Sequence, residues 1–128
     1  MAALRINPDF EMAHLNIGVI LADRGDNEAA IKHYKDALRI KPDFIAAYIN
    51  LGNGRLRQGH IADAISHYSE ALRLDPDSEQ AYNGLGAVMI RTGRIEKAIE
   101  FFEKALQLKP DYKEAQNNLK NTLAAMKK

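Results

Sequence analysis

Histidine is the residue type in this chain best suited to metal binding or acid–base catalysis, since the sequence has four histidines and no cysteine. His33 and His67 stand at equivalent positions of a repeating pattern, one full period apart, and we expect them to lie too far apart to share one metal ion. The sequence has no His-Glu-x-x-His motif, no glycine-rich phosphate loop and no nucleophile elbow. We therefore expect solvated or packed histidines, no catalytic residue, no metal and no cofactor.

Asparagine recurs with the same spacing. Asn16, Asn50 and Asn118 are separated by whole numbers of the period, and the one position missing from the series holds Gly84, with Asn83 beside it. A carboxamide offers two donors and one acceptor, so a row of carboxamides can pair with the backbone of an extended chain. The spacing predicts such a row; the alternative is that asparagine serves only local hydrogen bonding at this position.

Arginine recurs with the same spacing, since Arg57 and Arg91 lie one period apart. A guanidinium group can donate two parallel hydrogen bonds to a carboxylate. The pair could therefore receive an acidic side chain or a C-terminal carboxylate, and the alternative is an ordinary solvated pair.

These residues are placed by a 34-residue repeat that runs through the whole chain. Its equivalent positions hold Gly18, Gly52 and Gly86; Gly25, Gly59 and Gly93; Ala30, Ala64 and Ala98; and the aromatic residues Tyr34, Tyr68 and Phe102. Pro-Asp pairs begin at Pro8, Pro42, Pro76 and Pro110. A period of this length indicates stacked copies of one supersecondary unit.

Each unit is expected to contain two helices joined by a tight turn. In the first unit, one helix begins at Asp9 or Phe10 and ends at Gly25, which can adopt the left-handed conformation. A second helix spans residues 28–40 and ends before Pro42. The apolar spacing of the first helix predicts a buried stripe of Ala13, Ile17, Ile20 and Leu21. The glycines at 18, 52 and 86 are expected to face the alanines at 30, 64 and 98.

The repeat organises the 128 residues into a single all-α domain. Residues 1–10 match the end of a repeat, which suggests that the chain comes from a longer array; a short natural lead-in is the alternative. Full repeats are expected at residues 11–44, 45–78 and 79–112, followed by a capping helix at residues 113–128. Lys120 replaces the glycine of the earlier units and predicts a cap with a polar outer face.

Composition narrows the class of protein. Hydrophobic residues at 46% and charged residues at 27% are typical of a folded domain, and the net charge of +1 argues against a nucleic-acid partner. No apolar run approaches the roughly 20 residues of a membrane span, and the first residues do not resemble a signal peptide. We expect a soluble, cytoplasmic chain without direct membrane insertion, although a longer parent protein could be membrane-anchored.

The 34-residue period, the helix–turn–helix unit and the ladder of small and aromatic residues resemble tetratricopeptide repeats. The resemblance implies a right-handed superhelical solenoid whose first helices line a concave groove, which holds an extended peptide or a partner helix. The asparagine row resembles the ladder of the repeat domain of O-linked N-acetylglucosamine transferase. The carboxylate clamp by which some members hold chaperone tails does not fit, because its positions here hold Leu15, Val19, Asn50, Gln80 and Gly84, and only Asn50 matches.

The predicted function is protein–protein interaction through this groove. Its lining is expected to include Leu15, Asn16, Val19, Ile49, Asn50, Asn53, Arg57, Asn83, Arg91 and Asn118. Two alternatives remain, namely the recognition arm of a larger enzyme such as a glycosyltransferase, and a self-assembling scaffold. If no repeat precedes the first helix, its apolar residues predict homo-oligomer formation through the N-terminal end, by way of Phe10, Met12, Ile17 and Leu21.

Overall fold

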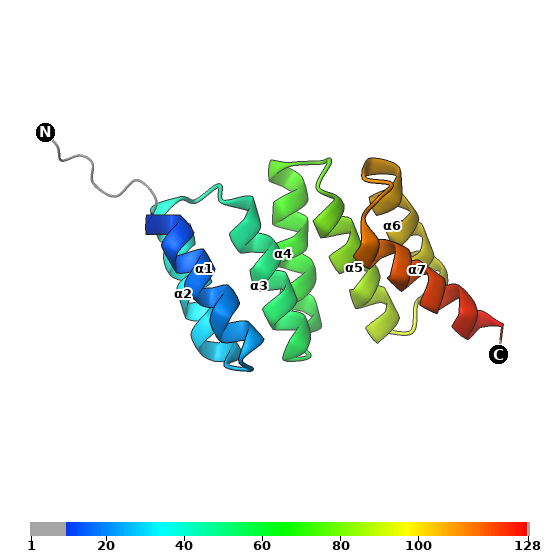
Figure 1. Ribbon diagram of the computed structural model, residues 1–128, viewed down its shortest axis with the longest axis horizontal. Coiled ribbons are helices and arrows are strands. Elements are labelled where there is room, and N and C mark those ends of the chain that lie inside the picture. Colours follow the sequence, from blue (N-terminus) through cyan, green and yellow to red (C-terminus); the bar gives the residue numbers. More distant parts are fainter. Residues whose placement is uncertain (1–9, 128) are drawn as a thin grey trace, which may run out of the picture.

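The computed structural model describes residues 10–127, which form seven helices and no strand (Figure 1). The helices are α1 (Phe10–Asp23), α2 (Asn27–Ile40), α3 (Ile45–Arg57), α4 (Ile61–Leu74), α5 (Glu79–Arg91), α6 (Ile95–Leu108) and α7 (Lys113–Met126). None of these helices is long and apolar enough to cross a membrane. The all-α repeat architecture predicted from the 34-residue period is confirmed.

The turn inside each helix pair is set by one glycine. Gly25, Gly59 and Gly93 have φ angles of 86°, 78° and 78°, a region that residues with a Cβ rarely enter. The residue after each glycine donates its N–H to a carbonyl five residues back, as in Asp26 to Leu21 at 2.9 Å. This hydrogen bond closes the helix end and turns the chain into the second helix.

Tyr34, Tyr68 and Phe102 form the centre of the three helix pairs, with exposures of 2%, 0% and 1%. A Cβ atom built on Gly18, Gly52 or Gly86 would come closer than 3.0 Å to the ring of its own repeat. The atoms nearest to these glycines therefore belong to the aromatic rings, and the prediction that the glycines face Ala30, Ala64 and Ala98 stays a prediction. The glycine leaves room for an aromatic ring of the second helix to lie against the backbone of the first.

The predicted buried stripe of α1 is wrong for Ala13, Ile17 and Ile20, which are exposed, whereas Leu21 packs against the core as predicted. Leu15 and Gly18 are buried, whereas Ile17 and Ile20 are 43% and 52% exposed. The residues equivalent to Ile17 in the next two repeats are Leu51 and Leu85, which are only 1% and 6% exposed. Those leucines have a preceding helix pair to pack against, and no described helix lies on that side of α1.

The helix pairs stack side by side along the molecule (Figure 1). Successive first helices touch, since α1 contacts α3, α3 contacts α5 and α5 contacts α7. Within residues 10–127, no Cα atom of α2 lies within 8 Å of a Cα atom of α4, and the same holds for α4 and α6. Because the first helices are drawn together and the second helices are spread apart, the array curves toward the side of α1, α3 and α5.

The last helix fits the cap that the sequence predicts only in part. Lys120 is exposed, but Leu123 and Met126 are 43% and 52% exposed on the same helix. Leu106 of α6 joins Leu119 and Leu123 around an apolar depression between α6 and α7. The outer face of α7 is therefore mixed rather than polar. The predicted tail of a preceding repeat, residues 1–10, lies outside the described residues except for Phe10.

Candidate peptide-binding groove

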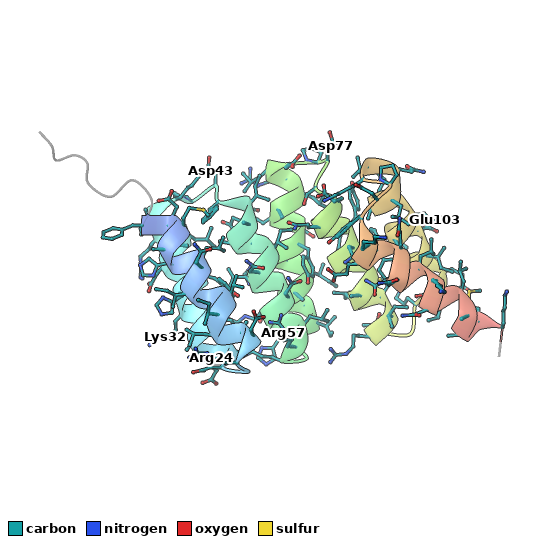
Figure 2. The ribbon with its side chains drawn as sticks, in the orientation of Figure 1. Arg24, Lys32, Asp43, Arg57, Asp77 and Glu103 are labelled. Carbon is teal, nitrogen blue, oxygen red and sulfur yellow. The ribbon has the colours of Figure 1, made fainter. Side chains whose placement is uncertain are left out.

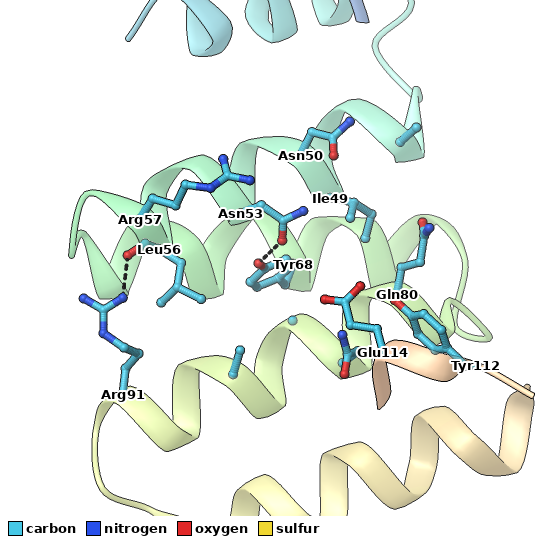
Figure 3. A pocket seen from close by; sticks show the side chains of 14 residues that line it. Ile49, Asn50, Asn53, Leu56, Arg57, Tyr68, Gln80, Arg91, Tyr112 and Glu114 are labelled. Carbon is cyan, nitrogen blue, oxygen red and sulfur yellow. Dashed lines mark hydrogen bonds between the residues drawn. The ribbon is translucent and has the colours of Figure 1, made fainter. Parts of the chain in front are cut away.

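A cavity of about 530 Å³ lies on the concave side, between α3 and α5 (Figure 3). Its walls are the inward faces of these two helices, its floor includes Tyr68 of α4, and the start of α7 closes one end. The lining residues are Ala46, Ile49, Asn50, Asn53, Leu56, Arg57, Tyr68, Gln80, Asn83, Gly84, Ala87, Arg91, Tyr112 and Glu114. The volume suits a short peptide segment rather than a large ligand.

Tyr68 holds the two walls at a fixed separation. Its buried ring lies between Gly52 of α3 and Gly84 of α5, where an added Cβ on either glycine would come closer than 3.0 Å to the ring. Its hydroxyl donates a hydrogen bond to Oδ1 of Asn53 (Figure 3). A tyrosine hydroxyl is protonated at neutral pH, and burial raises the pKa of this one above its usual value, so it remains a donor into the alkaline range.

In the third repeat, the position that holds asparagine in the other units packs against Tyr68. Gly84 occupies the position that Asn16, Asn50 and Asn118 occupy in the other units. Any side chain at Gly84 would overlap the Tyr68 ring. The gap in the asparagine row therefore lies where the Tyr68 ring packs between the second and third repeats.

Asn83 does not fill that gap as a free carboxamide. It is 4% exposed, and its Oδ1 accepts a hydrogen bond of 3.0 Å from Nδ2 of Asn118. Burial and, to a smaller extent, the Glu114 charge raise the pKa of the neighbouring Tyr112 to about 12, while a hydrogen bond with Asn83 acts in the opposite direction. Asn83 and Asn118 thus connect α5 to α7 and shape the end of the groove.

Asn50 is the carboxamide best placed to meet a ligand. It is half-buried, lines the groove and makes no hydrogen bond with the other residues drawn in Figure 3. Asn53, one helical turn further along α3, uses its oxygen for Tyr68 but points its amide nitrogen into the same space. Beside them, Ile49 supplies apolar surface that is 5% exposed. This stretch of α3 can therefore bind a backbone through polar groups and a side chain through Ile49.

Two guanidinium groups stand at the end of the groove opposite Glu114 (Figure 3). Nη1 of Arg57 donates to Oδ1 of Asn27 at 3.4 Å, and Nη1 of Arg91 donates to the carbonyl of Leu56 at 2.9 Å. Each contact orients a guanidinium without using all of its five N–H donors. The cavity therefore has a cationic end and an anionic end.

The structure brings six of the ten predicted site residues together in the groove, namely Ile49, Asn50, Asn53, Arg57, Asn83 and Arg91. Leu15 is instead a core residue of the first helix pair, at 8% exposure. Asn16 and Val19 are exposed on α1 and do not line the cavity, and Asn118 lines a smaller depression between α5 and α7. Tyr68 and Tyr112 were not predicted for the groove. The repeat pattern places Tyr68 in the core and gives no signal that its hydroxyl reaches the groove, and Tyr112 stands just before α7.

Comparison with known proteins identifies the repeat. Residues 49–113 match the family model described as tetratricopeptide repeat, and residues 18–59 match a second model described as TPR repeat. The chain belongs to the tetratricopeptide repeat family. No curated protein gives a significant match to the sequence.

Solved structures similar to this TPR domain include the first TPR of Spaghetti (RPAP3) bound to HSP90 peptide SRMEEVD, at 23% identity and a TM-score of 0.81, covering 96% of this chain and 98% of that one. The first TPR domain of human RPAP3 is similar at 24% identity and 0.84, covering 94% of both chains. A mutant O-GlcNAc transferase of Thermobaculum terrenum is similar at 29% identity and 0.83, covering 89% of this chain but only 22% of that one. The two RPAP3 matches bear on the fold alone.

Proposed function

We propose that this TPR domain is a non-catalytic protein-interaction module that binds an extended peptide between α3 and α5. The observation that carries the proposal is the arrangement of Asn50, Asn53 and Ile49 along one wall of a cavity with charged ends. A backbone can pair with the carboxamides whatever its side chains are, while Ile49 offers an apolar contact.

The charged ends predict the composition of the peptide. Arg57 and Arg91 suit an acidic side chain or a terminal carboxylate, and Glu114 suits a basic residue. Along α3, Asn50 and Arg57 are separated by about two helical turns, or about 10 Å of helix. An extended chain covers that length with about three residues. The core of the ligand is therefore a segment of about four to five residues, with an acidic residue at one end and a basic residue at the other.

Chaperone tails are not the ligand we favour. The positions at which the chaperone clamp would place its lysine, arginine and asparagine side chains hold Leu15, Val19, Gln80 and Gly84 here, with only Asn50 matching. Arg57 and Arg91 do not occupy these clamp positions on α3 and α5. They would therefore bind an acidic group at a different point of the groove.

A peptide-library screen tests the proposal, with binding measured by fluorescence anisotropy. Peptides with an acidic residue at one end are expected to bind, and replacing that residue by its amide should weaken binding. Arg91→Gln should weaken it about tenfold or more, since it removes a charge-assisted hydrogen bond, and Asn50→Ala by about fivefold.

Matched controls separate the groove from the rest of the surface. Arg24→Gln and Asn117→Ala change exposed residues of the same types outside the cavity and should leave the affinity unchanged. If the groove and control variants lose binding equally, or if no peptide binds the folded wild type, the proposal is wrong.

A second candidate is that the chain is the substrate-recognition arm of a larger enzyme, such as a glycosyltransferase. The 29% identity to part of a transferase chain favours it. Mass spectrometry of the native polypeptide tests this candidate, because it requires a catalytic domain beyond the present residues. A native polypeptide without one would leave only the first proposal.

A further inference from the structure

An aromatic pair joins the two helices of each repeat at the same position. The pairs are His14–His33, Tyr48–His67 and Tyr82–Phe101, with ring centroids 5.3, 6.5 and 6.2 Å apart and interplanar angles of 33°, 33° and 30°. The ring geometry is similar in the three repeats, but the residue types of the pairs differ. Of these three pairs, the one between α1 and α2 has ring nitrogens on both sides.

The two imidazoles approach through their nitrogens. The Nδ1 atoms of His14 and His33 lie 3.1 Å apart. Asp36 follows His33 by three positions on α2, which places both on the same face of that helix. One potential ligand atom from each of the three residues lies within 4.8 Å of the others, and all three residues are half-buried. The repeat spacing relates His33 to His67 and does not predict this pairing, which depends on how α1 packs against α2.

We propose that His14, His33 and Asp36 form a binding site for a divalent transition-metal ion such as Zn²⁺. With Zn–N bonds of about 2.05 Å and tetrahedral angles, two ligating nitrogens lie about 3.3 Å apart. The observed 3.1 Å separation is close to this value. Imidazole nitrogen and carboxylate oxygen are both ligands that Zn²⁺ accepts, and a water molecule would complete four-coordination.

The proton on the donating Nδ1 atom must move before both nitrogens can bind a metal ion. In the metal-free site one Nδ1 donates to the other, so one ring carries its proton on Nδ1. When the ion binds, that ring becomes its other tautomer, with the proton on Nε2, by exchange with solvent. Both rings stay neutral, and both Nδ1 lone pairs face the metal.

Asp36 must give up part of an existing contact. It forms an ion pair with Arg39, whose side chain is 72% exposed. Exposed ion pairs of this kind are weak, so the carboxylate can rotate toward the imidazoles. The helices that carry the ligands are already fixed by the contact of Tyr34 with Gly18, so the site is largely preorganised.

Calorimetric titration of the untagged chain with Zn²⁺ tests the proposal. One ion should bind per chain, Mg²⁺ should not compete because it prefers oxygen ligands, and Zn²⁺ should raise the melting temperature. His14→Tyr recreates the tyrosine–histidine pair of the second repeat, so it keeps the ring contact and removes a ligand. It should weaken binding about tenfold or more, since even changes to the residues that orient metal ligands cost about tenfold.

His67→Phe is the matched control, since it recreates the tyrosine–phenylalanine pair of the third repeat away from the site. Its Zn²⁺ affinity should equal that of the wild type. His33→Phe provides a second ligand variant in case His14→Tyr alters the fold, which metal-free melting will show. Absence of Zn²⁺ binding by the wild type, or equal affinity in both ligand variants and the control, would overturn the proposal.

Discussion

At the residue scale, buried tyrosine hydroxyls determine how the domain responds to alkaline pH. Burial raises the pKa of Tyr34 and Tyr68 above the ordinary value of 10.0, and raises that of Tyr112 to about 12. Between pH 10 and 12 the unfolded chain therefore releases protons that the folded chain keeps. The free energy of unfolding should be constant with respect to these groups below pH 10 and fall above it, by at most about 1.4 kcal/mol per pH unit for each tyrosine.

Denaturant unfolding followed by circular dichroism from pH 8 to 11.5 measures this fall. Tyr68→Phe removes one of the late-titrating groups and should make the decline shallower, because the variant has one proton fewer to keep. Equal slopes in the wild type and the variant would show that Tyr68 titrates normally.

At the scale of the helix, close packing at Gly84 outweighs helix propensity. Alanine is normally better than glycine inside a helix by about 1 kcal/mol. At Gly84 the added Cβ would overlap the Tyr68 ring, which is fully buried and held between α3 and α5. We expect Gly84→Ala to lower the free energy of unfolding by about 1–3 kcal/mol, as measured by denaturant titration.

Measuring Gly84→Ala in a Tyr68→Leu variant tests whether the tyrosine ring causes the loss of stability. In a Tyr68→Leu variant the overlap is gone, so adding Gly84→Ala should be neutral or stabilising there. A loss of the same size in both backgrounds would mean that the two residues are not coupled, contrary to the packing described here.

At the scale of the whole molecule, both ends of the array carry exposed apolar side chains. Phe10 and Ile20 of α1 are 53% and 52% exposed, and Leu123 and Met126 of α7 are 43% and 52% exposed. Surfaces of this kind favour association with another copy. We expect sedimentation velocity to show concentration-dependent self-association between micromolar and millimolar protein.

Single charge substitutions at each end distinguish the possible assemblies. A dimer formed through the α1 ends should be disrupted by Ile20→Lys but not by Leu123→Lys. A head-to-tail chain should be disrupted by either substitution. A wild type that remains monomeric throughout would contradict the prediction. Side chains of both charges project from the surface along the array, for example Lys32 on α2 and Glu103 on α6 (Figure 2).

The sequence by itself determined the repeat, the approximate helix boundaries and the side of the array on which α3 and α5 present their polar residues. These features follow from local signals, namely glycine at a left-handed turn, proline after a helix and an aromatic residue at a core position. The 34-residue period repeats these signals along the chain. Ile49, Asn50, Asn53, Arg57 and Arg91 were predicted for the same reason, since position within the repeat fixes the face of the helix.

Only the tertiary structure decided which of these side chains can contact a ligand and which are used in packing or in hydrogen bonds within the domain. Asn83 and Asn118 bond to each other, Gly84 makes room for a ring from the preceding repeat, and Ile17 is exposed where Leu51 is buried. His14 meets His33 because α1 and α2 cross at that point. Each outcome depends on a neighbour that belongs to another helix, or on the absence of such a neighbour among the described residues. A period describes what every repeat shares, whereas these contacts arise from the differences between adjacent repeats.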